Sequence, residues 1–114
     1  MAIGHLPPEP FASHIDVLTA AQALEVAIHA AGAGEAAMAI DQALTQVYNA
    51  WKYLQDGGYA DLAGSTSEVW HALNSLRAQV VSLPNDRLRA FLGGPLYGFQ
   101  GTLRWLDQQL IALG

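Results

Sequence analysis

The chain has 114 residues, 52% of them hydrophobic and only 13% charged, which excludes the disordered class and suits one domain with its own core. Its formal net charge of −5 at pH 7 argues against general binding to nucleic-acid phosphates. It contains no cysteine, which excludes disulfides and thiolate metal sites.

The N-terminal segment predicts an extended arm over residues 1–12, because the prolines at positions 7, 8 and 10 disfavour a helix there. Residues 1–8 lack the basic patch and apolar run of a secretion signal, so we expect a cytoplasmic protein. Ser13 then predicts a helix start, since a serine side chain caps free backbone N–H groups. This helix is expected to reach about Ala31, before two glycines.

The clearest helix is predicted over residues 35–55, where apolar residues step by three and four along one face and polar residues occupy the other. Gly57 and Gly58 are expected to end it. The apolar stripe consists of Ala37, Ile40, Leu44, Val47, Trp51 and Leu54.

The third helix is predicted to begin at a capping box, in which Ser65 and Glu68 would satisfy each other's backbone N–H groups. It is expected to run to about Leu83, because Pro84 breaks it. Its apolar stripe consists of Val69, Leu73, Leu76, Val80 and Leu83.

The last part of the chain predicts a short helix over residues 85–92, a flexible joint at residues 93–95, and a fourth main helix from Pro95 to Leu113. The stripe of this helix consists of Leu96, Phe99, Leu103, Leu106, Leu110 and Leu113. No run of about 18 apolar residues occurs anywhere, so no membrane span is expected.

These elements predict an all-α fold, an antiparallel up-down bundle of four main helices plus one short helix, because short connections favour antiparallel neighbours. The bundle would be a single domain over residues 13–114, preceded by the proline-rich arm.

Two acid–histidine pairs have spacings that could serve chemistry. Glu68 and His71 form a Glu-x-x-His pair, but a carboxylate–histidine metal site needs a second such pair, which the sequence lacks. Glu25 and His29 lie one turn apart and are expected on a solvated face. No nucleophile elbow, phosphate loop or dinucleotide motif occurs. We therefore predict no catalytic residue, metal or cofactor, and favour a protein that is not an enzyme.

The outward side of the fourth helix is unusual, because it combines aromatic and arginine residues with glycines that each lower helix stability by about 1 kcal/mol. Tyrosine, tryptophan and arginine are enriched at binding hot spots. The alternative is that the arm and the short helix cover this side within the chain. The predicted partner-binding residues are Tyr97, Gly98, Gly101, Arg104, Trp105 and Ile111, with Arg87 and Arg89 near the beginning of the helix.

The distribution of charge is uneven, with eight acids and one lysine up to residue 76, and four arginines and two aspartates after it. Such asymmetry can pair two parts of one fold or two subunits. We predict an interaction or regulatory protein that forms homo-oligomers or docks on a larger partner. The alternative is a small-molecule-binding bundle, with or without enzyme activity, whose aromatic pocket recognises an anionic ligand through arginines.

Overall fold

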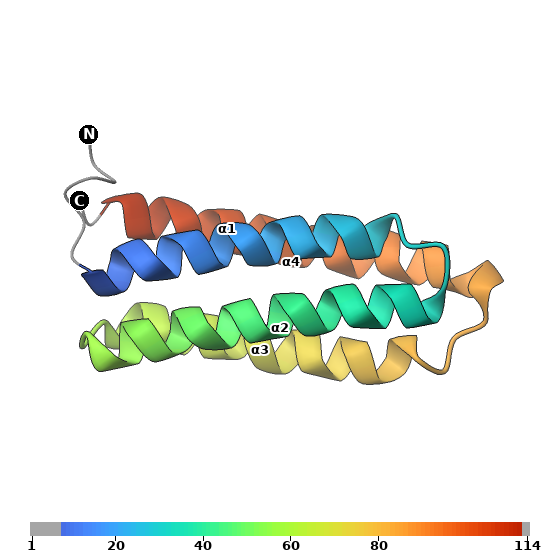
Figure 1. Ribbon diagram of the computed structural model, residues 1–114, viewed down its shortest axis with the longest axis horizontal. Helices are drawn as coiled ribbons and strands as arrows, with labels where there is room; N and C mark the ends of the chain where they lie inside the picture. Colours follow the sequence, from blue (N-terminus) through green and yellow to red (C-terminus); the bar gives the residue numbers. More distant parts are fainter. Residues whose placement is uncertain (1–7, 113–114) are drawn as a thin grey trace.

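The computed structural model describes residues 8–112, with the backbone only for residues 8–12 and 85. Four helices and no strands occupy this range, in the order α1 (Pro8–Ile28), α2 (Ala33–Asp56), α3 (Ala60–Val80) and α4 (Asn85–Ala112). The prediction of an all-helical protein is confirmed. The helices lie along the longest of three axes of 46, 23 and 18 Å, and the connecting loops alternate between the two ends of the molecule (Figure 1). None of these four helices combines the length and hydropathy that crossing a membrane requires.

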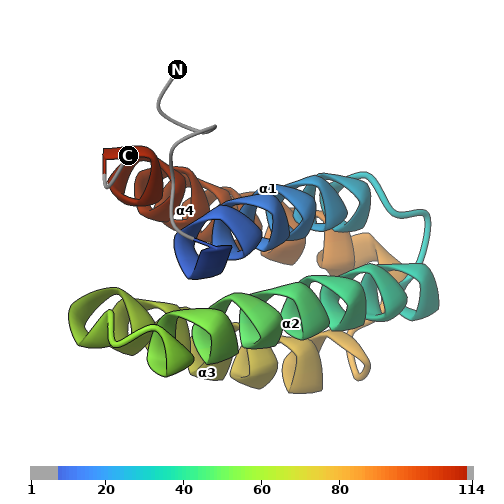
Figure 2. The same ribbon diagram turned by 60° about the vertical axis from the view of Figure 1, so that its left-hand side comes forward.

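The helices pack as two pairs. The α1 and α4 helices lie side by side in one layer, and α2 and α3 lie side by side in the other (Figure 2). Extensive packing of α1 against α2 joins the layers, whereas α3 and α4 contact each other only sparsely. The α1 and α2 helices therefore form the central contact of the fold, and α3 and α4 each pack mainly against one neighbour.

The core is a continuous cluster of leucine, isoleucine, valine and alanine from all four helices. The predicted core residues that are buried are Ile40, Leu44, Val47, Leu73, Leu76, Val80, Leu103, Leu106 and Leu110. Trp51 and Phe99 are partly buried and pack against this cluster. The spacing of apolar residues thus assigned the inward face of α2, α3 and α4 correctly.

The N-terminal helix starts earlier than predicted. Since α1 begins at Pro8, the predicted extended conformation is wrong for residues 8–12, and residues 1–7 of the expected arm lie outside the described range. Proline is tolerated in a first helical turn because the N–H it lacks would have no partner within the helix. Ser13 is not a cap: it is buried inside α1, and its hydroxyl donates to the carbonyl of Ala50 at 3.1 Å.

The third helix also starts earlier, at Ala60 rather than at the predicted capping box. The Ser65 hydroxyl donates to the carbonyl of Asp61 at 3.3 Å, one turn back within the helix, and Glu68 is exposed. The predicted capping box is therefore wrong. The turn before α3 depends instead on Gly58, whose φ of +84° is a conformation that favours glycine.

The predicted short helix and the fourth main helix are one element. Asn85–Ala112 forms α4 without a break, and Pro95 lies inside it. Leu88, Leu92 and Leu96 are all buried one turn apart, so an uninterrupted apolar stripe offsets the hydrogen bond that proline removes, a loss of about 3 kcal/mol in typical helices. The predicted end at Leu113 lies outside the described residues.

Candidate functional site

The predicted partner-binding residues of α4 lie mainly on its solvent side. Tyr97 and Trp105 keep 53% and 48% of their surface exposed, which is high for large aromatic side chains. We call the following six residues the α4 outer face: Tyr97, Gly98, Gly101, Arg104, Trp105 and Ile111. All are exposed except Ile111, which is half-buried.

The glycines of the α4 outer face have no role in the packing of the described residues. Outside the adjoining turns of α4, no heavy atom of the described residues lies within 4 Å of the position that a Cβ atom would take at Gly98 or Gly101. Neither residue adopts a positive φ, because Gly58 is the one described glycine that does. Alanine would therefore fit at both positions and would favour the helix.

The alternative prediction is that the N-terminal arm and the short helix before Gly93 cover this face within the chain. Residues 85–92 cannot lie over the α4 outer face, because they form the first turns of the same helix. The other expected cover, residues 1–7, lies outside the described range.

The two arginines near the start of α4 do not form one group. Arg87 and Arg89 are both exposed, but a helix turns by about 100° per residue, so their side chains leave it on nearly opposite sides. Arg87 precedes Trp105 by about five full turns and shares its side of α4. Arg87 therefore lies at the Trp105 edge of the α4 outer face, whereas Arg89 lies nearer to its Ile111 edge.

The seam between α1 and α4 shows which α1 residues border this surface. His14 contacts the carboxylate of Asp107, and the side-chain amide of Gln100 donates to the carbonyl of Ala21 at 3.0 Å. Leu18 lies one turn after His14 and one turn before Ala21, so it sits at the same seam. Because Leu18 is 40% exposed, the apolar surface extends from α4 onto α1.

The α1 helix contributes further exposed apolar side chains that the sequence analysis missed. Ile15 and Val26 are 48% and 57% exposed. Ile15 precedes Leu18 by one turn, whereas Val26 borders a hollow with Gln42 and Gln46 of α2. With Tyr97 and Trp105, these three make up five of the nine large hydrophobic residues exposed in the described part of the chain. The signal was present in the sequence, because α1 is apolar on nearly all sides, unlike α2.

A polar network connects the two helices of this layer. The Gln100 amide donates to Glu25 Oε2 at 3.0 Å, and Glu25 Oε1 lies 3.1 Å from His29 Nε2. The hydrogen bond from Gln100 and the contact with His29 lower the pKa of Glu25, and Arg104 adds a smaller favourable charge interaction. Glu25 and His29 are exposed, as expected for a solvated face, and the network joins α1 to α4.

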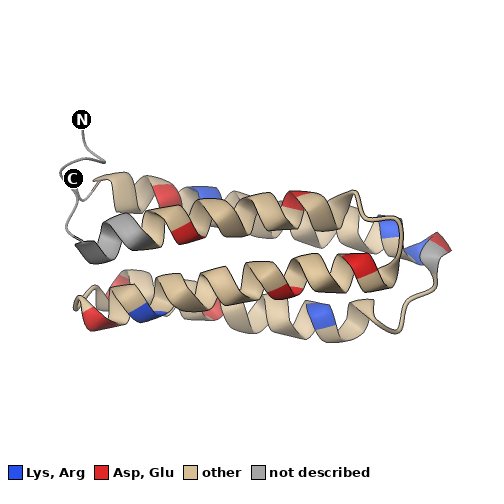
Figure 3. Cartoon of the chain, in the orientation of Figure 1, with Lys and Arg blue, Asp and Glu red and all other residues tan. Residues whose placement is uncertain are grey.

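The other acid–histidine pair is also exposed. Glu68 and His71 both face solvent on α3, and the imidazole of His71 contacts the Trp70 ring edge-on. Among the side chains that the structure describes, no group of three or more histidine and acidic residues is placed to hold a metal ion. Charged residues are spread thinly along all four helices (Figure 3).

A pocket of about 170 Å³ lies between α2 and α3, away from the α4 outer face. Its lining includes three aromatic residues and no arginine. The lining residues are Tyr48, Trp51, Ser67, Trp70 and His71.

Comparison of the chain with protein-family models, with curated proteins and with solved structures gives no match.

Proposed function

We propose that this chain is a helical interaction protein that binds another protein chain through the α4 outer face. The observation that carries the proposal is the pairing of half-exposed Tyr97 and Trp105 with glycines whose Cβ positions meet no atom of the described residues outside the adjoining turns of α4. Exposed aromatic residues supply contact area at hot spots, and glycine lets a second backbone approach closely. A contact with another chain would account for both features.

The neighbouring surface of α1 supports the same proposal. Leu18 and, one turn before it, Ile15 extend the exposed apolar area from α4 onto α1, and extended apolar patches on soluble domains typically mark binding sites. A partner that covers both helices would bury aliphatic and aromatic side chains together.

The partner that we propose first is a second copy of this chain. The low charged fraction of 13% lowers the electrostatic repulsion between identical surfaces, and it leaves few charges to desolvate when two copies meet. Arg104 and Arg87 could then approach acidic residues of the neighbouring copy. Docking of the same face on a larger protein is the other form of this proposal.

A concentration series of two-dimensional ¹H–¹⁵N NMR spectra tests the proposal. Between micromolar and millimolar protein, we expect the backbone signals of Gly98 and Gly101 and the indole signal of Trp105 to shift or broaden. The amide of Gly64, an exposed glycine on α3, is the control and should stay unchanged. Self-association that perturbs Gly64 while leaving the α4 signals unchanged would contradict the proposed surface.

A further inference from the structure

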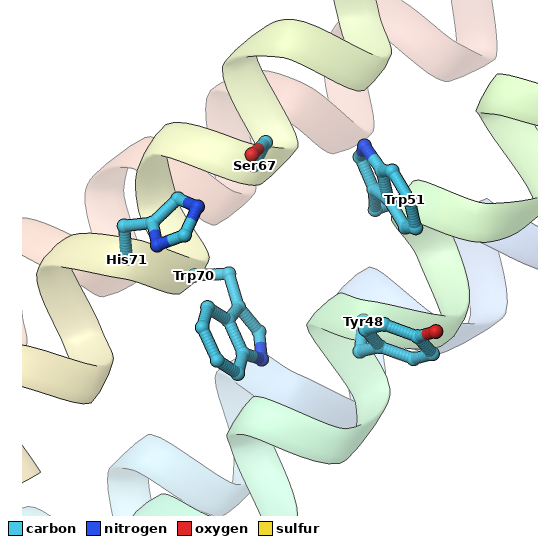
Figure 4. A pocket seen from close by; sticks show the side chains of 5 residues that line it. All are labelled: Tyr48, Trp51, Ser67, Trp70 and His71. Atoms are coloured by element: carbon cyan, nitrogen blue, oxygen red, sulfur yellow. The ribbon is translucent and has the colours of Figure 1, made fainter.

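The pocket between α2 and α3 has an aromatic lining that comes from both helices. Tyr48 and Trp51 lie on α2, whereas Ser67, Trp70 and His71 lie on α3, and the two groups face each other across open space (Figure 4). Neighbouring rings support each other on each side: Tyr48 and Trp51 have centroids 5.6 Å apart, and Trp70 and His71 have centroids 5.2 Å apart. Each wall of the pocket is therefore held in place by ring contacts within the protein itself.

The volume of the pocket indicates the size of its ligand. At about 170 Å³, it is close to a cavity of about 150 Å³ that is known to accept benzene in another protein. One aromatic ring, or two fused rings that partly project into solvent, would fill it. Stacking and edge-to-face contacts between rings add about 0.5–1.5 kcal/mol to simple burial, so an aromatic ligand gains more here than an aliphatic one.

The polar groups of the pocket are the hydroxyls of Tyr48 and Ser67, two indole N–H groups and the imidazole of His71. Tyr48 and Ser67 supply hydroxyls, and neither Trp51 nor Trp70 has a hydrogen-bond partner for its indole N–H among the described residues. The indole nitrogen of Trp70 lies on the side of its ring nearer to Tyr48 (Figure 4). These donors could bind a hydroxyl or carbonyl oxygen of a ligand.

The charges around the pocket favour an uncharged ligand. No carboxylate, lysine or arginine lines it. The Asp41 carboxylate, which borders the next hollow along the same two helices, is held by Arg77 in an ion pair. A charged ligand would thus lose hydration without meeting an unpaired opposite charge.

We propose that this pocket is a binding site for an uncharged aromatic compound of one or two rings that carries a hydroxyl, carbonyl or N–H group. This site is separate from the α4 outer face and does not depend on the function proposed for it. Tyr48, Trp51 and Trp70 would enclose the ring, and Ser67 and the indole N–H groups would orient its polar substituent.

Titration with phenol and with indole, followed by the tryptophan indole signals in ¹H–¹⁵N NMR spectra, tests the proposal. The chain has three tryptophans, of which Trp105 on α4 does not line the pocket and serves as an internal control. We expect saturable shifts of the Trp51 and Trp70 signals and no shift of the Trp105 signal. Cyclohexanol, which lacks a π system, should bind at least about threefold more weakly than phenol.

Two matched variants locate the binding site. Ser67→Phe places a ring inside the pocket and should weaken phenol binding by about tenfold or more, because the space is then filled. Ser75→Phe makes the same change at an exposed position of α3 and should leave binding unchanged. Far-ultraviolet circular dichroism should show native helix content in both.

Three results would overturn the proposal. The first is the absence of saturable shifts of Trp51 and Trp70 with both probes. The second is a Ser67→Phe variant that folds and binds phenol as the wild type does. The third is tighter binding of tetramethylammonium than of either aromatic probe, because that preference would define a cation site instead.

Discussion

Arg77 on α3 holds Asp41 on α2 through two hydrogen bonds, from Nε to Oδ1 at 2.9 Å and from Nη2 to Oδ2 at 3.1 Å. This bidentate geometry fixes the relative position of two helices whose residues are 36 apart in the sequence. The pair joins an acid of the acidic portion of the chain to an arginine of the basic portion. Part of the charge asymmetry is therefore satisfied within the fold.

The first prediction concerns this ion pair. Both side chains are partly exposed, at 37% for Arg77 and 50% for Asp41, so water and salt screen their attraction. A double-mutant cycle with Arg77→Ala and Asp41→Ala should give a coupling energy of about 0.2–1 kcal/mol in denaturant unfolding. The coupling should fall as salt is added, and a coupling that is insensitive to salt would contradict an electrostatic origin.

The second prediction concerns the core. Leu106 is 1% exposed, and its replacement by alanine removes apolar contacts and leaves a cavity. Leu106→Ala should lower the free energy of unfolding by about 2–5 kcal/mol. Leu18→Ala, the same change at a position that is 40% exposed, should cost less than about 1.5 kcal/mol. Equal losses at the two sites would mean that α4 packs on its neighbours through a different face.

The sequence predicted the inward faces of the helices well because their apolar spacing is strong and regular. Leu44 and Leu106, for example, were predicted to be buried from the spacing of apolar residues alone, and both are buried. Helix boundaries were less predictable. Pro8 suits a first helical turn as well as an extended segment, and Pro95 disfavours a helix locally while the buried leucines around it support one. Local preference for a break was outweighed by leucine burial in α4.

The candidate sites were predictable to different extents. Tyr97 and Trp105 could be singled out because a helix side opposite a leucine stripe is normally polar. The exposed side of α1 was missed because alanine and valine on all sides of a helix conceal which side is outward. The pocket between α2 and α3 depends on how Trp51 and Trp70 meet across two helices, which single-helix spacing does not encode.

The third prediction concerns the glycines of the α4 outer face. Because a Cβ atom at Gly98 or Gly101 would meet no described atom outside the adjoining turns of α4, each change to alanine should raise the free energy of unfolding by about 0.5–1 kcal/mol when the protein is dilute. The same changes should weaken association, since the added methyl groups would separate the two chains. Thermal unfolding and sedimentation measure the two effects separately. A loss of monomer stability would contradict the open surroundings of these glycines.

The fourth prediction concerns Asp16, whose Oδ2 atom is buried without a hydrogen-bond partner among the described residues. Burial raises its pKa above the ordinary value of 3.8, so ionisation disfavours the folded state. The resulting loss of stability is absent when the pH is below the ordinary pKa of 3.8. It develops as the pH rises from there through the raised native pKa. Asp16→Asn should therefore be more stable than the wild type at neutral pH, and this advantage should shrink on acidification.

A comparison of unfolding curves across the acidic range checks the Asp16 prediction. Glu68→Gln is the control, because it makes the same acid-to-amide change at an exposed position and should give little gain at neutral pH. If the stability gained by Asp16→Asn grew as the pH falls, the result would contradict a pKa raised by burial.

Light scattering of the Trp105→Glu variant tests the central proposal most directly. Tyr53→Glu on α2 is the matched control, because Tyr53 is 46% exposed and Trp105 is 48% exposed. If the α4 outer face binds a second copy, the wild type and Tyr53→Glu should share an oligomeric mass. Trp105→Glu should give the monomer mass with unchanged helix content by circular dichroism, since an unpaired charge would have to be buried in the contact. A Trp105→Glu protein that keeps the wild-type oligomeric mass would contradict the proposal.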